Sequence, residues 1–130
     1  MSSEGQQPAS GVGQRRVFVV EDEIMIRMLL EDMLSDLGYD VAGTAGGLDE
    51  ALTLAREADV DVAILDVNLN GNPVYPVAQI LTARGVPFIF STGYGEQGLP
   101  DAYRDCPMLQ KPFQMENLER ALAVITANAA

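Results

Sequence analysis

The sequence contains no histidine, no tryptophan and one cysteine, Cys106. A single thiol cannot form an internal disulfide, and without histidine the chain cannot build a zinc site of the usual ligand types. Basic residues are also scarce, since 8 Lys and Arg face 19 Asp and Glu, which gives a formal charge of −11. This composition argues against binding to nucleic acid or to an anionic membrane surface.

Long apolar runs are missing as well. No stretch of the sequence approaches the roughly 20 apolar residues that a membrane-spanning helix needs, and the N-terminus does not resemble a signal peptide. We therefore expect a cytoplasmic protein without membrane contact. A length of 130 residues predicts one domain with a substantial core.

Large apolar side chains are almost absent from residues 1–14, which are mainly Ser, Gly, Gln and Pro. Such a segment cannot bury enough surface to offset its ordering entropy. The sequence therefore predicts a disordered tail over residues 1–14 and a folded domain over residues 15–130.

From Val17 on, short apolar runs alternate with helical periods of three and four residues. Strands are expected at residues 17–20, 40–45, 62–65, 87–91 and 108–110. Apolar helical stripes are expected over residues 26–37, 48–55, 74–81 and 115–125, with a loop at residues 68–73. Glycine and proline crowd residues 93–100, so a helix there should be short or flexible. The alternation predicts an α/β fold, a parallel sheet with helices on both faces.

Polar residues follow four of the five predicted strands. They are Glu21, Asp22 and Glu23 after the first strand, Asp66 after the third, Thr92 after the fourth and Lys111 after the fifth. In a doubly wound sheet these strand ends share one crevice. Crowded carboxylates repel one another, and a hard cation such as Mg²⁺ relieves that repulsion.

Carboxylates, Mg²⁺, a lysine and a hydroxyl are the components of phosphoryl transfer to an aspartate. Asp66 would be the nucleophile, and Lys111 would offset charge on the transferred group. Gly93, directly after Thr92, would leave the approach open.

Each of these residues also has a structural interpretation. The acidic triplet suits the first turn of a helix, Asp66 could form a turn, and Lys111 could be a solvated surface charge. The functional interpretation rests on their joint placement after strands one, three, four and five.

Four segments together resemble the receiver domains of bacterial response regulators. They are Val19-Val20-Glu21-Asp22-Glu23, Ile64-Leu65-Asp66-Val67-Asn68-Leu69, Phe90-Ser91-Thr92-Gly93-Tyr94 and Lys111-Pro112-Phe113. The resemblance implies a flavodoxin-like sheet of strand order 2-1-3-4-5. It also implies that Asp66 accepts a phosphoryl group from a histidine kinase or a histidine phosphotransfer protein.

The resemblance further assigns a role to each matching position. Asp22 would bind Mg²⁺ directly and Glu21 through water, while the backbone carbonyl of Asn68 would complete the ligands beside Asp66. Thr92 would be the switch hydroxyl. Lys111 would pair with the phosphoryl group, and the family usually has a cis peptide bond before the residue at Pro112.

Other positions would modulate the site. Asn68 and Tyr94 occupy the positions that tune the lifetime of the aspartyl phosphate. Met108 stands where the family commonly has an aromatic ring that reports the threonine motion. With the Phe-x-Thr-Gly-Tyr segment, these features resemble a branch of single-domain regulators that pair with HWE or HisKA2 kinases. An order-to-disorder change near residues 95–105 would then be the natural switch.

The sequence leaves several alternatives open. We expect a stand-alone receiver, a monomer or transient dimer that signals through protein contacts and is not an enzyme. A receiver excised from a larger hybrid kinase is left open. A binding module that keeps the fold but has lost phosphorylation is a further alternative, and the complete set of acidic residues argues against it. A haloacid-dehalogenase-like phosphatase would carry its nucleophile after the first strand, whereas Asp66 follows the third. Flavin binding would need a phosphate cradle where Glu21, Asp22 and Glu23 stand.

Overall fold

The computed structural model describes residues 15–93 and 99–128. Its main sheet consists of five parallel strands, β1 (Arg16–Val20), β2 (Asp40–Ala45), β3 (Val62–Asp66), β6 (Phe88–Thr92) and β7 (Met108–Gln110). Their order in the sheet is β2-β1-β3-β6-β7, which is 2-1-3-4-5 when these five strands are counted along the chain. The predicted doubly wound, flavodoxin-like sheet is confirmed. The tail predicted over residues 1–14 lies outside the described residues.

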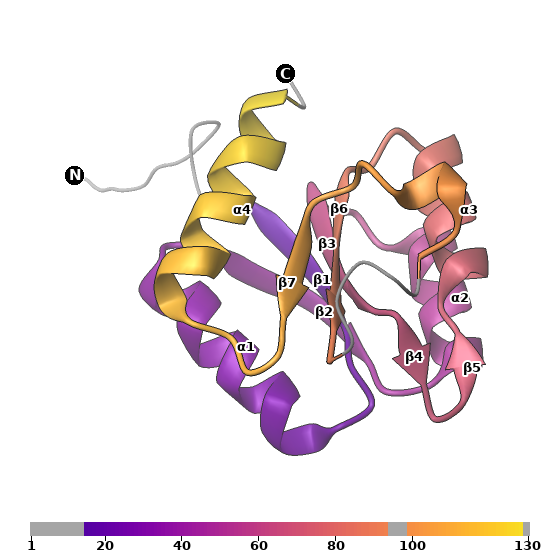
Figure 1. The fold of residues 1–130 in the computed structure, drawn as a ribbon, viewed down its shortest axis with the longest axis horizontal. Coiled ribbons are helices and arrows are strands. Elements are labelled where there is room, and N and C mark those ends of the chain that lie inside the picture. The colour runs from indigo at the N-terminus through magenta and orange to yellow at the C-terminus, as the bar shows by residue number, and fades with distance from the viewer. Residues whose placement is uncertain (1–14, 94–98, 129–130) are drawn as a thin grey trace.

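Helices cover both faces of this sheet (Figure 1). They are α1 (Ile24–Asp36), α2 (Leu48–Glu57), α3 (Tyr75–Ala83) and α4 (Met115–Asn128). Helices α1 and α4 pack on one face, and α2 and α3 pack on the other. Because both faces are covered, β3 is apolar throughout until Asp66 and is buried along its whole length.

The apolar stripe of α1 is narrower than the sequence predicts. Leu30 and Leu34 are fully buried, whereas Leu29 is 44 % exposed. Residues four apart share one helix face, and Leu29 lies about 100° around the helix from Leu30. Leu29 lies within the stripe predicted over residues 26–37 but is on the exposed side of the helix.

The predicted loop after β3 is a small hairpin of β4 (Asn68–Leu69) and β5 (Asn72–Pro73). Asn70 and Gly71 connect the two strands with φ values of 51° and 89°. Asn-Gly is the sequence that tight two-residue hairpin turns favour, because both positions require positive φ. The Gly71 amide also donates to Asn68 Oδ1 at 2.7 Å.

Between β6 and β7, the described residues contain one turn of 3₁₀ helix, η3 (Asp101–Tyr103), in place of a regular fourth helix. Tyr103 covers the sheet from this turn. Its ring stacks on Tyr75 with centroids 5.5 Å apart and meets Phe90 edge-on at 5.3 Å. Aromatic packing thus holds a segment in which glycine and proline disfavour an α-helix.

Candidate functional site

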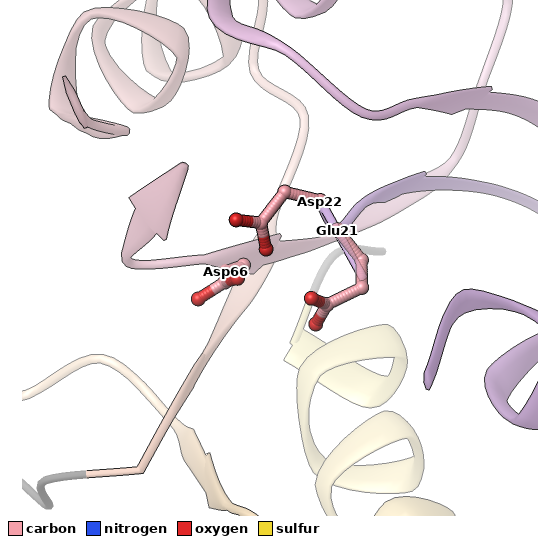
Figure 2. Close-up of side chains that lie close together, drawn as sticks. All are labelled: Glu21, Asp22 and Asp66. Atoms are coloured by element: carbon pink, nitrogen blue, oxygen red, sulfur yellow. The ribbon is translucent and has the colours of Figure 1, made fainter. Parts of the chain in front are cut away.

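Three carboxylates meet at the ends of β1 and β3 (Figure 2). Glu21 directly follows β1 and is completely buried, Asp22 is next to it, and Asp66 is the buried last residue of β3. One oxygen from each carboxylate lies within 4.8 Å of the others. Neighbouring parallel strands that end at one edge place these side chains together, as the sequence indicated.

Thr92 at the end of β6 and Lys111 directly after β7 lie at the same edge of the sheet. The ammonium of Lys111 lies 2.9 Å from Glu21 Oε1 and 3.3 Å from Asp66 Oδ2. Thr92 is the buried last residue of β6, and its carbonyl accepts a hydrogen bond from the Lys111 amide at 2.9 Å. The peptide bond between Lys111 and Pro112 is cis.

Each carboxylate also accepts a hydrogen bond from a backbone amide, and each bond engages one oxygen. The donors and acceptors are Glu23 N to Glu21 Oε2 (3.1 Å), Asn68 N to Asp66 Oδ1 (3.3 Å) and Asn70 N to Asp22 Oδ2 (3.0 Å). Amide donors stabilise a carboxylate without adding a formal charge. The acidic cluster is therefore held by the backbone around it.

The pKa values of the site reflect competing effects. Burial and the nearby charge of Glu21 raise the pKa of Asp66 to about 7, although Lys111 opposes this shift. Burial would lower the pKa of Lys111, but the hydrogen bond to Glu21 and the charge of Asp66 outweigh it and raise that pKa. Burial would raise the pKa of Asp22, yet hydrogen bonds to Asp66, Glu21 and Asn70 lower it overall.

The cluster opens into a surface cleft. The residues that line it are Asp22, Glu23, Asp66, Val67, Asn68, Asn70, Gly71, Thr92, Gly93, Leu99 and Lys111. A β-carbon at Gly93 would meet no atom of residues 15–93 and 99–128 within 4 Å, so these residues leave that side of the cleft open. Tyr94 lies outside the described residues. Met108 is partly buried in β7, pairs with Phe90 and packs against the core cluster that faces α2 and α3.

The donor set of the cluster suits a divalent cation. Hard cations such as Mg²⁺ prefer carboxylate and carbonyl oxygens, and Glu21, Asp22 and Asp66 supply three carboxylates. Glu21 Oε1 is buried, and among the described residues its one polar partner is the Lys111 ammonium at 2.9 Å. A buried oxygen with unused acceptor capacity fits a site that takes a further cation or a bound water.

Two contacts of this site were absent from the sequence prediction. The Asn70 amide donates a hydrogen bond to Asp22, which lies 48 positions earlier in the sequence, and the Glu23 amide donates to Glu21. The Asn70-Gly71 pair was an available signal for a tight hairpin, but it does not reveal that the hairpin contacts Asp22.

None of the helices in the described ranges is long and apolar enough to span a bilayer.

The family model of the response regulator receiver domain matches residues 17–123. The transcriptional regulatory protein PdtaR of Mycobacterium tuberculosis is 34% identical over 112 residues, which are 83% of this chain and 55% of that protein. The chain thus spans about half the length of this relative.

Solved structures agree with this match. The solution structure of SdrG from Sphingomonas melonis Fr1 superposes with a TM-score of 0.78 and 42% identity, covering 86% of this chain and 96% of that one. The receiver domain of the sensor histidine kinase PA1611 from Pseudomonas aeruginosa PAO1, solved with magnesium in its active-site cleft, has a TM-score of 0.74 and 25% identity. It covers 88% of this chain and 99% of that one. The chain belongs to the response regulator receiver domains, the CheY-like family of two-component signalling.

Proposed function

We propose that Asp66 accepts a phosphoryl group from a histidine of a kinase or a phosphotransfer protein, in a reaction that depends on Mg²⁺. The observation that carries this proposal is the position of Asp66, buried at the end of β3 between the Lys111 ammonium and two further carboxylates, at the base of an open cleft. An oxygen of Asp66 would form the new bond to phosphorus as the bond from phosphorus to the histidine nitrogen breaks.

Mg²⁺ would be held by Asp22, Asp66 and the backbone carbonyl of Asn68, with Glu21 acting through water. When bound, it supplies charge neutralisation for the transferring oxygens. The magnesium in the similar PA1611 receiver supports this assignment. The 2.9 Å ion pair of Glu21 with Lys111 supports a role for Glu21 outside the direct ligands.

The remaining polar residues would stabilise and read the product. Lys111 would pair with the phosphoryl group. Its ammonium lies 3.3 Å from Asp66 Oδ2, the side chain that would carry that group. Thr92 would act as the switch hydroxyl, with Gly93 leaving it room. Asn68 and Tyr94 would tune the lifetime of the aspartyl phosphate.

Met108 cannot stack as an aromatic ring does, so the usual coupling from threonine to an aromatic at this position would be altered. Tyr103 contacts Phe90, which precedes Thr92 by two residues on β6. The order-to-disorder switch proposed for residues 95–105 includes Tyr103, while residues 94–98 lie outside the described part of the chain.

The start of α1 would receive the phosphodonor. Four large apolar side chains are exposed there, Ile24 (62 %), Met25 (84 %), Met28 (57 %) and Leu29 (44 %). They follow Asp22 and Glu23, which line the cleft. An exposed apolar patch beside a reacting group suits the helix that presents the histidine. The segment Phe90-Ser91-Thr92-Gly93-Tyr94 supports the proposal of a single-domain regulator of the Phe-x-Thr-Gly-Tyr branch and a kinase of the HWE or HisKA2 type.

We further propose that residues 15–130 form the receiver domain after a tail of 14 residues, and that it works as a stand-alone cytoplasmic protein. The family match over residues 17–123 and the 96% coverage of the SdrG chain support these boundaries. The protein would be a monomer or transient dimer that accepts phosphate without multiple turnover.

The deciding experiment is phosphorylation by acetyl phosphate with MgCl₂, followed by intact mass and by amide chemical shifts around Thr92 and Lys111. We expect the parent protein to gain one phosphoryl group and the Asp66→Asn variant to gain none. Asp36→Asn, an exposed aspartate on α1, is the matched control and should behave as the parent. Equal phosphorylation of Asp66→Asn would refute the acceptor assignment, and rapid release of phosphate from a small phosphomonoester would indicate a phosphatase instead.

A further inference from the structure

The β4–β5 hairpin forms one wall of the cleft and contacts the acidic cluster through backbone amides. Asn68 donates to Asp66 Oδ1 at 3.3 Å, and Asn70 donates to Asp22 Oδ2 at 3.0 Å. No residue from 67 to 83 carries a charge, so the hairpin holds these carboxylates with N–H groups alone. Each bond engages one oxygen and leaves the other available.

We propose that the Asn70 amide, presented by this hairpin, positions Asp22 as a one-oxygen ligand and thereby makes the site select Mg²⁺ over Ca²⁺. The inference rests on the proposed function, because it concerns the cation that the phosphoryl-transfer reaction would use. Asn70 is a positioning residue in this scheme, since it touches Asp22 and no reacting atom.

The chemistry of the two cations supports this selectivity. Ca²⁺ takes six to eight oxygens and often binds both oxygens of one carboxylate, whereas Mg²⁺ requires an octahedron and retains several waters. Two-oxygen binding by Asp22 would place the cation on Oδ2, where it competes with the hydrogen bond from Asn70 for the lone pairs of that oxygen. Among the described residues, the same restriction applies to Glu21 and Asp66, each of which has one oxygen on a backbone amide.

The backbone of the turn determines where the Asn70 amide points. Asn70 has a φ of 51°, in the left-handed region that asparagine and glycine adopt more readily than other residues. Asn68 Oδ1 accepts from Gly71 at 2.7 Å and stabilises the same turn. A β-branched residue at position 70 would strain this conformation and turn the amide away from Asp22.

The test measures dissociation constants for MgCl₂ and CaCl₂ by isothermal titration calorimetry, without a phosphodonor. We expect Asn70→Val to weaken Mg²⁺ binding about tenfold, the effect of losing one hydrogen bond to a charged group, and to leave Ca²⁺ binding nearly unchanged. Asn70→Gly retains the amide and the positive φ, so it should keep the Mg²⁺ preference of the parent. Asn68→Ala, which removes the bond to Gly71, should shift the preference in the same direction by a smaller factor.

Several results would overturn the inference. They are an unchanged preference in Asn70→Val, an equal loss for both cations, or a loss in Asn70→Gly as large as in Asn70→Val. Thermal melting and amide spectra of each variant establish that it is folded, and Asn68→Ala tests the inference if Asn70→Val does not fold. A parent protein that binds no Mg²⁺ would contradict the proposed function itself, whereas the results above leave phosphorylation of Asp66 intact.

Discussion

The two halves of the strand-end site are held in different ways. In the half formed by β1 and β3, a backbone amide engages each of the three carboxylates. In the half formed by β6 and β7, Lys111 is held by its ion pairs with Glu21 and Asp66. The described residues between β6 and β7 include only the single 3₁₀ turn η3. The corresponding connection after β1 contains the 13-residue helix α1.

This difference separates a preset part of the site from an adjustable part. Hydrogen bonds from the backbone hold the acidic groups with donors that carry no formal charge. The position of Lys111 depends on the charges of Glu21 and Asp66, so we expect a change of charge at Asp66 to redirect it. We therefore expect changes to residues of β6 and β7 to alter how the site responds to a change of charge at Asp66. Changes to the carboxylates after β1 and β3 should alter cation binding.

The largest expected effect is that of Lys111→Met, which breaks the link between the halves. It leaves Glu21 completely buried without its positive partner. Removing one member of a buried pair costs about 3–5 kcal/mol, and we expect the lower end because the Lys111 side chain is 17 % exposed. Urea unfolding measures this loss, and phosphorylation by acetyl phosphate should fall at the same time.

A double variant provides the control for this prediction. Glu21→Gln combined with Lys111→Met removes both charges, so it should recover part of the lost stability without recovering phosphorylation. If the double variant is as unstable as Lys111→Met, the unpaired charge of Glu21 does not cause the loss.

A second effect, smaller over any single pH unit, is a dependence of stability on pH in the metal-free protein. The pKa of Asp66 is 3.8 in its ordinary state and about 7 when folded, so the native state holds its proton more tightly than the unfolded state. This contribution to stability is complete below pH 3.8 and is lost as pH rises through 7, with a slope of at most about 1.4 kcal/mol per pH unit. Chemical unfolding between pH 4 and 8 checks the direction.

The shifts of the neighbouring groups act outside this window. The lowered pKa of Asp22 affects stability only in more acidic solution, and the raised pKa of Lys111 only in alkaline solution. Asp66→Asn should therefore flatten the curve between pH 4 and 7, and saturating Mg²⁺ should do the same by favouring the carboxylate. A slope that persists in Asp66→Asn would assign the titration to another group.

The smallest effect on folding is expected from Met25→Lys, on the outer surface of the β1–β3 half. Met25 is 84 % exposed, so the free energy of unfolding should change by less than about 0.5 kcal/mol. Phosphorylation by acetyl phosphate should stay normal, while transfer from the cognate kinase should fall because the docking patch is interrupted. Phosphotransfer profiling measures this separation.

Val124→Lys is the matched control for that experiment. Val124 is 50 % exposed on α4, a different helix from the one that carries the apolar patch. Loss of kinase transfer in Val124→Lys but not in Met25→Lys would move the docking face from α1 to α4.

The strands of the main sheet and the meeting of Asp66 with Glu21, Asp22 and Lys111 could be predicted from the sequence. Continuous apolar runs such as Val62–Leu65 require a strand covered on both faces, and the strand ends then fix which side chains meet. The exposure of Leu29 could not be predicted, because an apolar stripe in a sequence does not indicate how much of the helix surface the sheet covers.

The strands of the β4–β5 hairpin were harder to predict than its Asn70-Gly71 turn. Each of its strands has two residues, too few for a periodic pattern, and part of its support is the bond from Asn70 to Asp22, 48 positions away. The turn at η3 was foreseeable as short, but the stacking of Tyr103 on Tyr75 depends on tertiary packing.

The turn between β4 and β5 has a consequence for how the protein ages. Asparagine followed by glycine deamidates when the glycine nitrogen attacks the side-chain amide carbon and ammonia leaves. In the fold, the Gly71 nitrogen donates its hydrogen to Asn68 Oδ1 at 2.7 Å, which keeps that nitrogen engaged. Native protein should therefore resist this conversion longer than unfolded chain, and storage in denaturant should place a new negative charge next to Asp22.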